Sequence, residues 1–166
     1  MDDVAALNAM PPADALAAFL RCCGSRRWTD AMTARRPFAS ADDLYTAADE
    51  VWAGLGRDDW LEAFAAHPRI GDLDALRKKF APTAAWCAGE QSGVADAGDT
   101  VLRELAAGNR DYEAKFGYIF IVCATGKSAA EMLAILKVRL PNDPAAELRV
   151  AAAEQSKITR LRLEKL

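Results

Sequence analysis

Residues 142–166 read NDPAAELRVAAAEQSKITRLRLEKL, and this stretch indicates the fold class of the chain. Asp143 is a suitable N-cap residue, and Pro144 takes the first helical position, where a missing backbone N–H is no loss. No glycine or second proline interrupts the residues that follow, and alanine, the best helix former, recurs among them. The stretch therefore predicts a long C-terminal helix in a helical protein.

The same signals mark helices along the rest of the chain. Ser40 can cap a helix whose first turn holds Asp42 and Asp43, acidic residues that suit the positive end of the helix dipole. Ser128 and Glu131 have the spacing of a capping box. Further helices are expected near residues 12–22, 28–36, 58–67, 73–80, 83–95 and 98–116, the one near 58–67 capped by Asp58 and ending before Pro68.

Residues 117–128, GYIFIVCATGKS, carry a different pattern. The run is apolar, rich in β-branched residues and bounded by glycines, so it fits either a strand or an extended buried segment, and periodicity does not separate the two. The remaining segments show no repeat or linker. We expect a single compact all-α domain over residues 1–166, with about seven to nine helices.

Composition narrows the class of protein. The chain has 166 residues, 52% of them hydrophobic and 27% charged, with a net charge of −3. These values predict a globular domain with no nucleic-acid partner. No apolar run approaches the roughly 20 residues of a membrane span. The four cysteines form no Cys-x-x-Cys pair, and there is one histidine, so we expect reduced thiols, a cytoplasmic location and no metal site.

His67, the single histidine, carries two interpretations. At 100° per residue it shares a helix face with Trp60 and Phe64, which fits a core histidine hydrogen-bonded to some carbonyl. Its place at the carboxyl end of the helix fits an acid/base group instead, because the negative end of the dipole favours imidazolium and holds the group near neutral pH.

Two other charged residues fall on predicted apolar faces. Glu90 shares a face with Trp86 in the helix near 83–95, either as a paired or protonated acid/base group or as a rim residue that reaches solvent. Arg162 lies on the apolar stripe of the last helix, which also holds Gln155. An inward arginine needs an anionic partner, which is either a carboxylate such as Glu90 or an anionic ligand.

Five segments taken in order resemble one known family. They are AHPRIGD (66–72), GEQSGV (89–94), FGYIFIVCATGKSAAEML (116–133), RLPND (139–143) and EQSKITRLRLEKL (154–166). The resemblance is to the 2-oxo-4-hydroxy-4-carboxy-5-ureidoimidazoline (OHCU) decarboxylases of uric acid breakdown. It implies an all-α fold, a decarboxylation that uses no cofactor, (S)-allantoin as the product and a possible homodimer.

The resemblance also implies site residues. His67 and Glu90 correspond to the catalytic residues of the family. Those implied to bind the small-molecule substrate are Pro68, Cys87, Gln91, Phe120, Ile121, Val122, Cys123, Ala124 and Arg162, the segment 120–124 through its main chain. Cys87 departs from the family, which commonly has serine there, and a thiol is a much poorer hydrogen-bond donor than a hydroxyl.

Two other functions fit the same residues. One is a non-catalytic helical module that binds a purine-derived anion, which would need Arg162 but would not need His67 with Glu90. The other is a decarboxylase of a related carboxylated ureide, which would differ only in its pocket walls.

Overall fold

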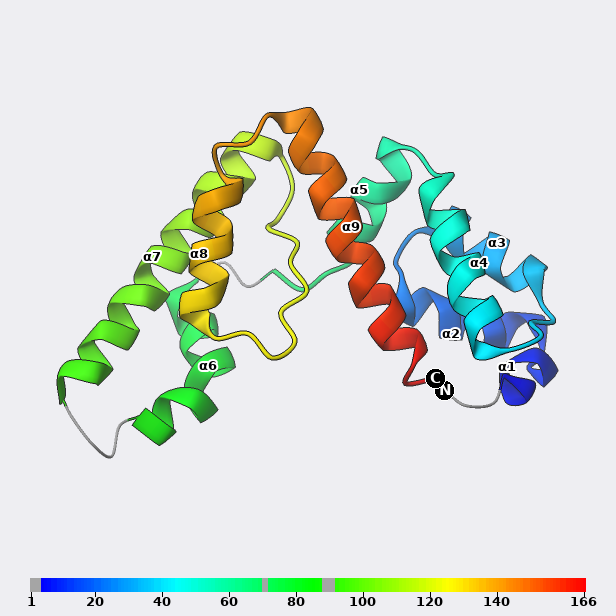
Figure 1. Ribbon diagram of the computed structural model, residues 1–166, viewed down its shortest axis with the longest axis horizontal. Coiled ribbons are helices and arrows are strands. Elements are labelled where there is room, and N and C mark those ends of the chain that lie inside the picture. Colours follow the sequence, from blue (N-terminus) through cyan, green and yellow to red (C-terminus); the bar gives the residue numbers. More distant parts are fainter. Residues whose placement is uncertain (1–3, 70–71, 88–91) are drawn as a thin grey trace. The chain divides into compact units, whose positions relative to one another are not determined.

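The computed structural model describes residues 4–69, 72–87 and 92–166, without the side chains of residues 81–97. These residues form nine helices and no strand, which confirms the all-α prediction. The helices are α1 (Ala5–Ala9), α2 (Pro12–Cys22), α3 (Arg26–Arg35), α4 (Ala41–Ala53), α5 (Arg57–Ala65), α6 (Leu73–Cys87), α7 (Ser92–Phe116), α8 (Ala129–Arg139) and α9 (Pro144–Leu163) (Figure 1). In the described part of the chain, no helix is long and apolar enough to span a membrane.

The chain divides into two units. Unit 1 comprises residues 1–67 and 148–166, and unit 2 comprises residues 68–147. Unit 2 is therefore inserted between two segments of unit 1, and the division falls within α9.

Large aromatic side chains build the core of unit 1. Phe19 and Trp28 are both 0% exposed and meet edge to face, with ring centroids 5.9 Å apart. The indole N–H of Trp28 donates to the Ala48 carbonyl at 3.1 Å, and that of Trp52 donates to the Ala152 carbonyl at 2.9 Å. These bonds satisfy the polar atoms that the buried indoles bring with them, so burial of the rings costs little. They also attach α3 to α4, and α4 to α9.

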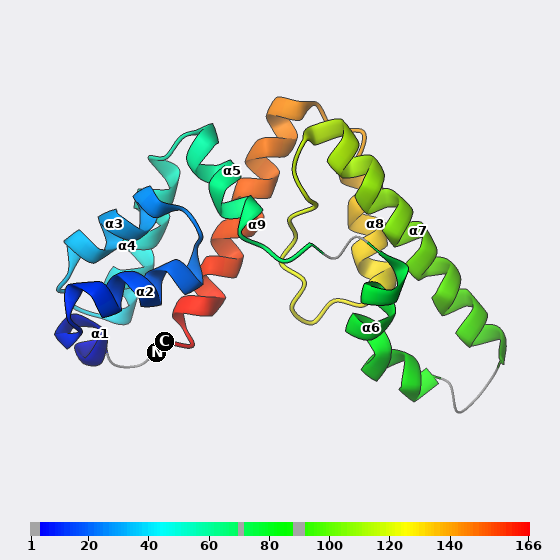
Figure 2. The ribbon, with the colours of Figure 1, turned by 180° about the vertical axis from the view of Figure 1, so that it is seen from behind.

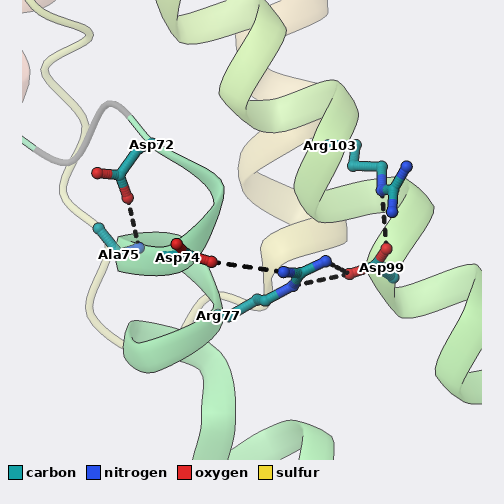
Figure 3. Close-up of polar contacts among 6 residues, drawn as sticks. All are labelled: Asp72, Asp74, Ala75, Arg77, Asp99 and Arg103. Carbon is teal, nitrogen blue, oxygen red and sulfur yellow. Dashed lines mark hydrogen bonds and ion pairs between the residues drawn. The ribbon is translucent and has the colours of Figure 1, made fainter.

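Unit 2 is built on α7, which packs along both α6 and α8 (Figures 1 and 2). Gly108 of α7 permits the close approach of α8, because a Cβ at this position would overlap the buried Leu136 side chain. At the surface, Arg77 of α6 reaches Asp99 of α7 at 2.8 Å, and Asp99 also accepts from Arg103 at 2.8 Å (Figure 3).

Most predicted helix starts agree with the structure. The Ser40 hydroxyl accepts from the Asp43 N–H at 3.1 Å, and Ser128 with Glu131 forms the expected capping box. The Asp143 carboxylate accepts from the Ala145 N–H at 3.0 Å, as an N-cap does.

Two local predictions were wrong, and one open choice is resolved. The helix α5 begins at Arg57, capped by Gly56 with the Asp59 side chain, rather than by Asp58. The helix expected near 83–95 is instead the end of α6 and the start of α7, and residues 88–91 lie outside the described part. Residues 117–128 form no strand and cross between α7 and α8 without regular secondary structure (Figure 1).

Candidate active site

His67 lies just beyond the end of α5. The helix ends at Ala65, Ala66 is its C-cap, and the backbone N–H of His67 donates to the Phe64 carbonyl at 3.2 Å. Phe64 is fully buried, whereas the imidazole is only partly buried. His67 therefore lies beyond the helix at the edge of the unit 1 core, and not within the helix on the predicted face of Trp60 and Phe64.

One ring nitrogen of His67 is bound by a buried side chain. The Nε2 atom lies 2.5 Å from Oε1 of Gln155 in α9, and Gln155 is 0% exposed. The expected carbonyl partner is thus a side-chain amide oxygen. Within the described residues the imidazole forms no other hydrogen bond.

Burial lowers the pKa of His67 below its ordinary value of 6.5. The hydrogen bond with Gln155 raises this pKa and the positive charge of Arg162 lowers it. Desolvation is the largest of these effects, and it acts against the imidazolium that the helix end was expected to favour. A lowered pKa favours the neutral imidazole, which is the form that accepts a proton.

Arg162 of α9 is partly buried in the same unit. Its Nη1 atom donates to the Arg21 carbonyl at 3.4 Å and to the Cys22 carbonyl at 3.3 Å, at the end of α2. Among the described residues no carboxylate forms an ion pair with Arg162. The guanidinium also borders an open hollow of about 650 Å³ with Arg21, Gly24, Ala66 and Lys165 along its edge. A cationic hollow of this kind suits an anionic ligand.

Gly24 allows the turn between α2 and α3 to approach the end of α5. A Cβ built on Gly24 would overlap the Cβ of Ala66, the residue before His67. Since Ala66 has no flexible side chain to move aside, any larger residue at position 24 would displace the backbone that carries the imidazole.

Residues 120–124 lie in unit 2, where Arg139 of α8 anchors them. The Nη1 atom of Arg139 donates to the Ile121 carbonyl at 2.7 Å, and its guanidinium carbon lies 4.7 Å from the centroid of the Phe120 ring. Ile121 and Cys123 are buried, whereas Phe120, Val122 and Ala124 are partly exposed.

Glu147 holds Arg139 in place. Its Oε1 atom accepts from Arg139 Nε at 2.7 Å and from the Tyr112 hydroxyl at 2.6 Å, and its Oε2 atom accepts from Asn142 at 3.0 Å. Both carboxylate oxygens of the fully buried Glu147 are therefore paired, and in this network only Asn142 is partly exposed. This network fixes the path of a segment that has no strand or helix to hold it.

The predicted site residues are described to different extents. The structure brings His67 and Arg162 together in unit 1, Pro68 follows His67 and is exposed, and Phe120 to Ala124 belong to unit 2. Glu90 and Gln91 lie outside the described residues, as does the side chain of Cys87. The prediction that Glu90 shares a helix face with Trp86 also lies outside the described residues, because the side chain of Trp86 is not described either.

Two interactions were missed by sequence reasoning. Gln155 was placed on the inward stripe of the last helix but received no role, although a buried amide is a signal for a specific partner. No sequence pattern indicated that Arg139 and Glu147 face inward, and their pairing is seen only in the hydrogen-bond network around Glu147.

An all-α protein with a half-buried imidazole and a nearby guanidinium is equipped for acid/base chemistry on an anionic ligand. The comparisons with known proteins identify its class. The family model described as OHCU decarboxylase matches residues 8–164. The chain therefore belongs to the OHCU decarboxylase family, which confirms the resemblance seen in the sequence.

Several relatives support the assignment. The chain is 44% identical to the uric acid degradation bifunctional protein TTL of Arabidopsis thaliana over 148 residues, which cover 87% of the chain and 45% of that protein. It thus spans less than half the length of the Arabidopsis relative. It is 33% identical to the OHCU decarboxylase of Amia calva over 133 residues, which cover 78% of the chain and 73% of that protein.

Solved structures share the fold. A crystal structure of an OHCU decarboxylase in the presence of (S)-allantoin matches with a TM-score of 0.69 at 38% identity, covering 89% of this chain and 94% of that one. An (S)-allantoin synthase matches with a TM-score of 0.70 at 20% identity, covering 98% of this chain and 53% of that one, which bears on the fold alone.

Proposed function

We propose that this chain is a carboxy-lyase that converts OHCU to (S)-allantoin without a cofactor. The observation that carries the proposal is the half-buried imidazole of His67, bound at Nε2 by Gln155 in the same unit as Arg162, in a chain that matches the OHCU decarboxylase family over 8–164. The name of the Arabidopsis relative places that protein in uric acid degradation, the Amia calva relative is named as an OHCU decarboxylase, and we extend both roles to this chain.

The reaction sets three tasks. The substrate carbon bears a carboxylate and a hydroxyl next to a ring carbonyl, so loss of carbon dioxide leaves an electron pair that delocalises onto that carbonyl as an enolate. The enzyme must hold the carboxylate out of the ring plane, stabilise the enolate oxygen and deliver a proton to one face of the carbon.

In this proposal His67 is the acid/base group and Arg162 binds a carbonyl or carboxylate oxygen through its guanidinium. Glu90 orients the substrate hydroxyl and tunes His67, while Gln91 holds the ureido group. A positioned acid/base group contributes about 10²- to 10⁴-fold in rate. Pro68, Cys87 and the segment 120–124 complete the substrate contacts, the last through its main chain. Arg139 fixes the path of that segment through the Ile121 carbonyl.

The whole of residues 1–166 would form one functional domain, because the family match runs through both units. We also propose that the protein acts in the cytoplasm as a homodimer. Light scattering coupled to size-exclusion chromatography would test the oligomeric state, and a monomer at all concentrations would remove the homodimer from the proposal.

The activity is tested by generating the substrate in situ from urate with an oxidase and a hydrolase, and then following circular dichroism. We expect faster formation of optically active allantoin. A rate equal to the racemic, uncatalysed background would exclude the enzyme and leave a helical module that binds a purine-derived anion. Acceleration with a related carboxylated ureide but not with OHCU would show that the chain is a decarboxylase of that ureide instead.

His67→Ala separates a catalytic role from a core role. Under this proposal the variant loses at least about 10²-fold in rate and keeps a cooperative unfolding transition. Loss of folding instead of activity alone would mean that His67 is a structural residue.

A further inference from the structure

The buried Gln155 side chain forms one hydrogen bond with Thr159 and one with His67. The Nε2 amide nitrogen of Gln155 donates to the Thr159 hydroxyl oxygen at 3.1 Å, one turn further along α9. The Thr159 hydroxyl oxygen is the acceptor in this bond, because an amide nitrogen can only donate.

The hydrogen bond to Thr159 orients the amide group of Gln155. Because the nitrogen of Gln155 faces Thr159, its oxygen faces His67 and accepts a proton from Nε2 at 2.5 Å. Gln155 is 0% exposed and Thr159 is 5% exposed, so water does not compete for either group. A neutral imidazole has one N–H, and this arrangement assigns it to Nε2.

We propose that Gln155 is a positioning residue, whose side-chain oxygen holds His67 as the Nε2–H tautomer so that Nδ1 is the nitrogen that exchanges a proton with the substrate. The inference rests on the proposed function for its catalytic consequence. The tautomer itself is a property of the free protein. Gln155 acts through His67 and does not itself touch the reacting carbon.

The single histidine makes the tautomer directly measurable. In untagged protein labelled with ¹⁵N-histidine, every imidazole signal belongs to His67. We expect the wild type above its imidazole pKa to show a protonated Nε2 and an unprotonated Nδ1. In Gln155→Leu the Nε2–H loses its acceptor, and we expect a mixture of the two tautomers.

Kinetics then test the consequence for the reaction. For Gln155→Leu we expect kcat to fall by roughly 10- to 100-fold with KM unchanged, the size of effect seen when a partner that orients a histidine is removed. The acid limb of its pH profile moves to lower pH, because the lost hydrogen bond had raised the pKa of His67. In Gln155→Glu the carboxylate keeps the same tautomer and moves the limb to higher pH.

Ser156→Ala is the matched control on the same helix. Its hydroxyl donates to Asp49 at 2.7 Å, away from His67, so its loss perturbs α9 without changing the imidazole. We expect the wild-type tautomer and pH profile in this variant.

Three results would overturn the inference: a wild-type His67 protonated at Nδ1, an unchanged tautomer in Gln155→Leu, or equal pH profiles in the two Gln155 variants. If Gln155→Leu does not fold, the isosteric Gln155→Glu variant and the wild-type tautomer still decide it. A wild type that lacks decarboxylase activity would refute the proposed function instead, while the nitrogen spectrum would still report the tautomer.

Discussion

Arg139 and Glu147 form an ion pair sealed inside unit 2, with Nη2 and Oε1 2.5 Å apart and side chains 6% and 0% exposed. The same guanidinium donates to the Ile121 carbonyl, so a single buried charge connects the pair to the segment proposed to bind substrate. A buried charge that keeps its partner is tolerated, whereas one that loses its partner is strongly unfavourable.

Arg139→Met is therefore expected to lower the free energy of unfolding by about 3–5 kcal/mol, because it leaves the Glu147 carboxylate buried without its counter-ion. Urea unfolding measures the change. Arg77→Met is the matched control, since Arg77 pairs with Asp99 at the exposed surface (Figure 3) and such pairs contribute little. Equal losses in the two variants would contradict the prediction.

Replacement of glycine by alanine is expected to have opposite effects on stability at two positions of α7. Gly108→Ala pushes a methyl group into the buried Leu136 side chain and is expected to destabilise by about 1–3 kcal/mol. Gly98→Ala meets nothing within 4 Å at an exposed helical position, so it is expected to stabilise by about 0.5–1 kcal/mol. Thermal or urea unfolding of both variants tests the pair, and destabilisation by Gly98→Ala would count against the helix geometry here.

The lowered pKa of His67 predicts that the free energy of unfolding depends on pH. Its pKa is below 6.5 in the folded state, so as pH falls below about 6.5 the unfolded chain binds a proton that the folded chain does not. The free energy of unfolding should therefore decrease through this window, and His67 should contribute no pH dependence above it. We expect the free energy of unfolding of the wild type to fall relative to that of His67→Gln when the pH is lowered from 7.5 to 5.5. A constant difference would show that the imidazole pKa is not lowered.

Cys22 and Cys23 are expected to resist alkylation. Both are buried, and burial raises the pKa of each thiol to about 11, so almost no thiolate is present at pH 8. A short iodoacetamide pulse on the native protein, followed by peptide mass spectrometry, should find both unmodified. The same pulse in denaturant should modify both, and modification of either in the native protein would contradict their burial.

Much of the helical framework could be predicted because its signals are local. Ser40, the Ser128–Glu131 capping box and Asp143 each satisfy backbone groups within a few residues, so neighbouring sequence contains the required information. The N-cap of α5 was placed two residues too late, at Asp58 instead of Gly56, and it is the Asp59 side chain that reaches the Gly56 N–H.

The candidate site was only partly predictable. His67 and Arg162 followed from helix faces and from the family resemblance, but the direction of the His67 pKa depends on how deeply the ring is buried, which no local pattern reveals.

The sequence by itself determined most of the helices, most of their caps and the family, since each depends on short-range patterns and on residue identity. Only the tertiary structure decided that Gln155, 88 residues along the chain, meets His67, and that Arg139 holds the Ile121 carbonyl. Such contacts arise when separate helices bury their faces together. A buried polar atom then takes the partner that the fold brings within hydrogen-bond distance.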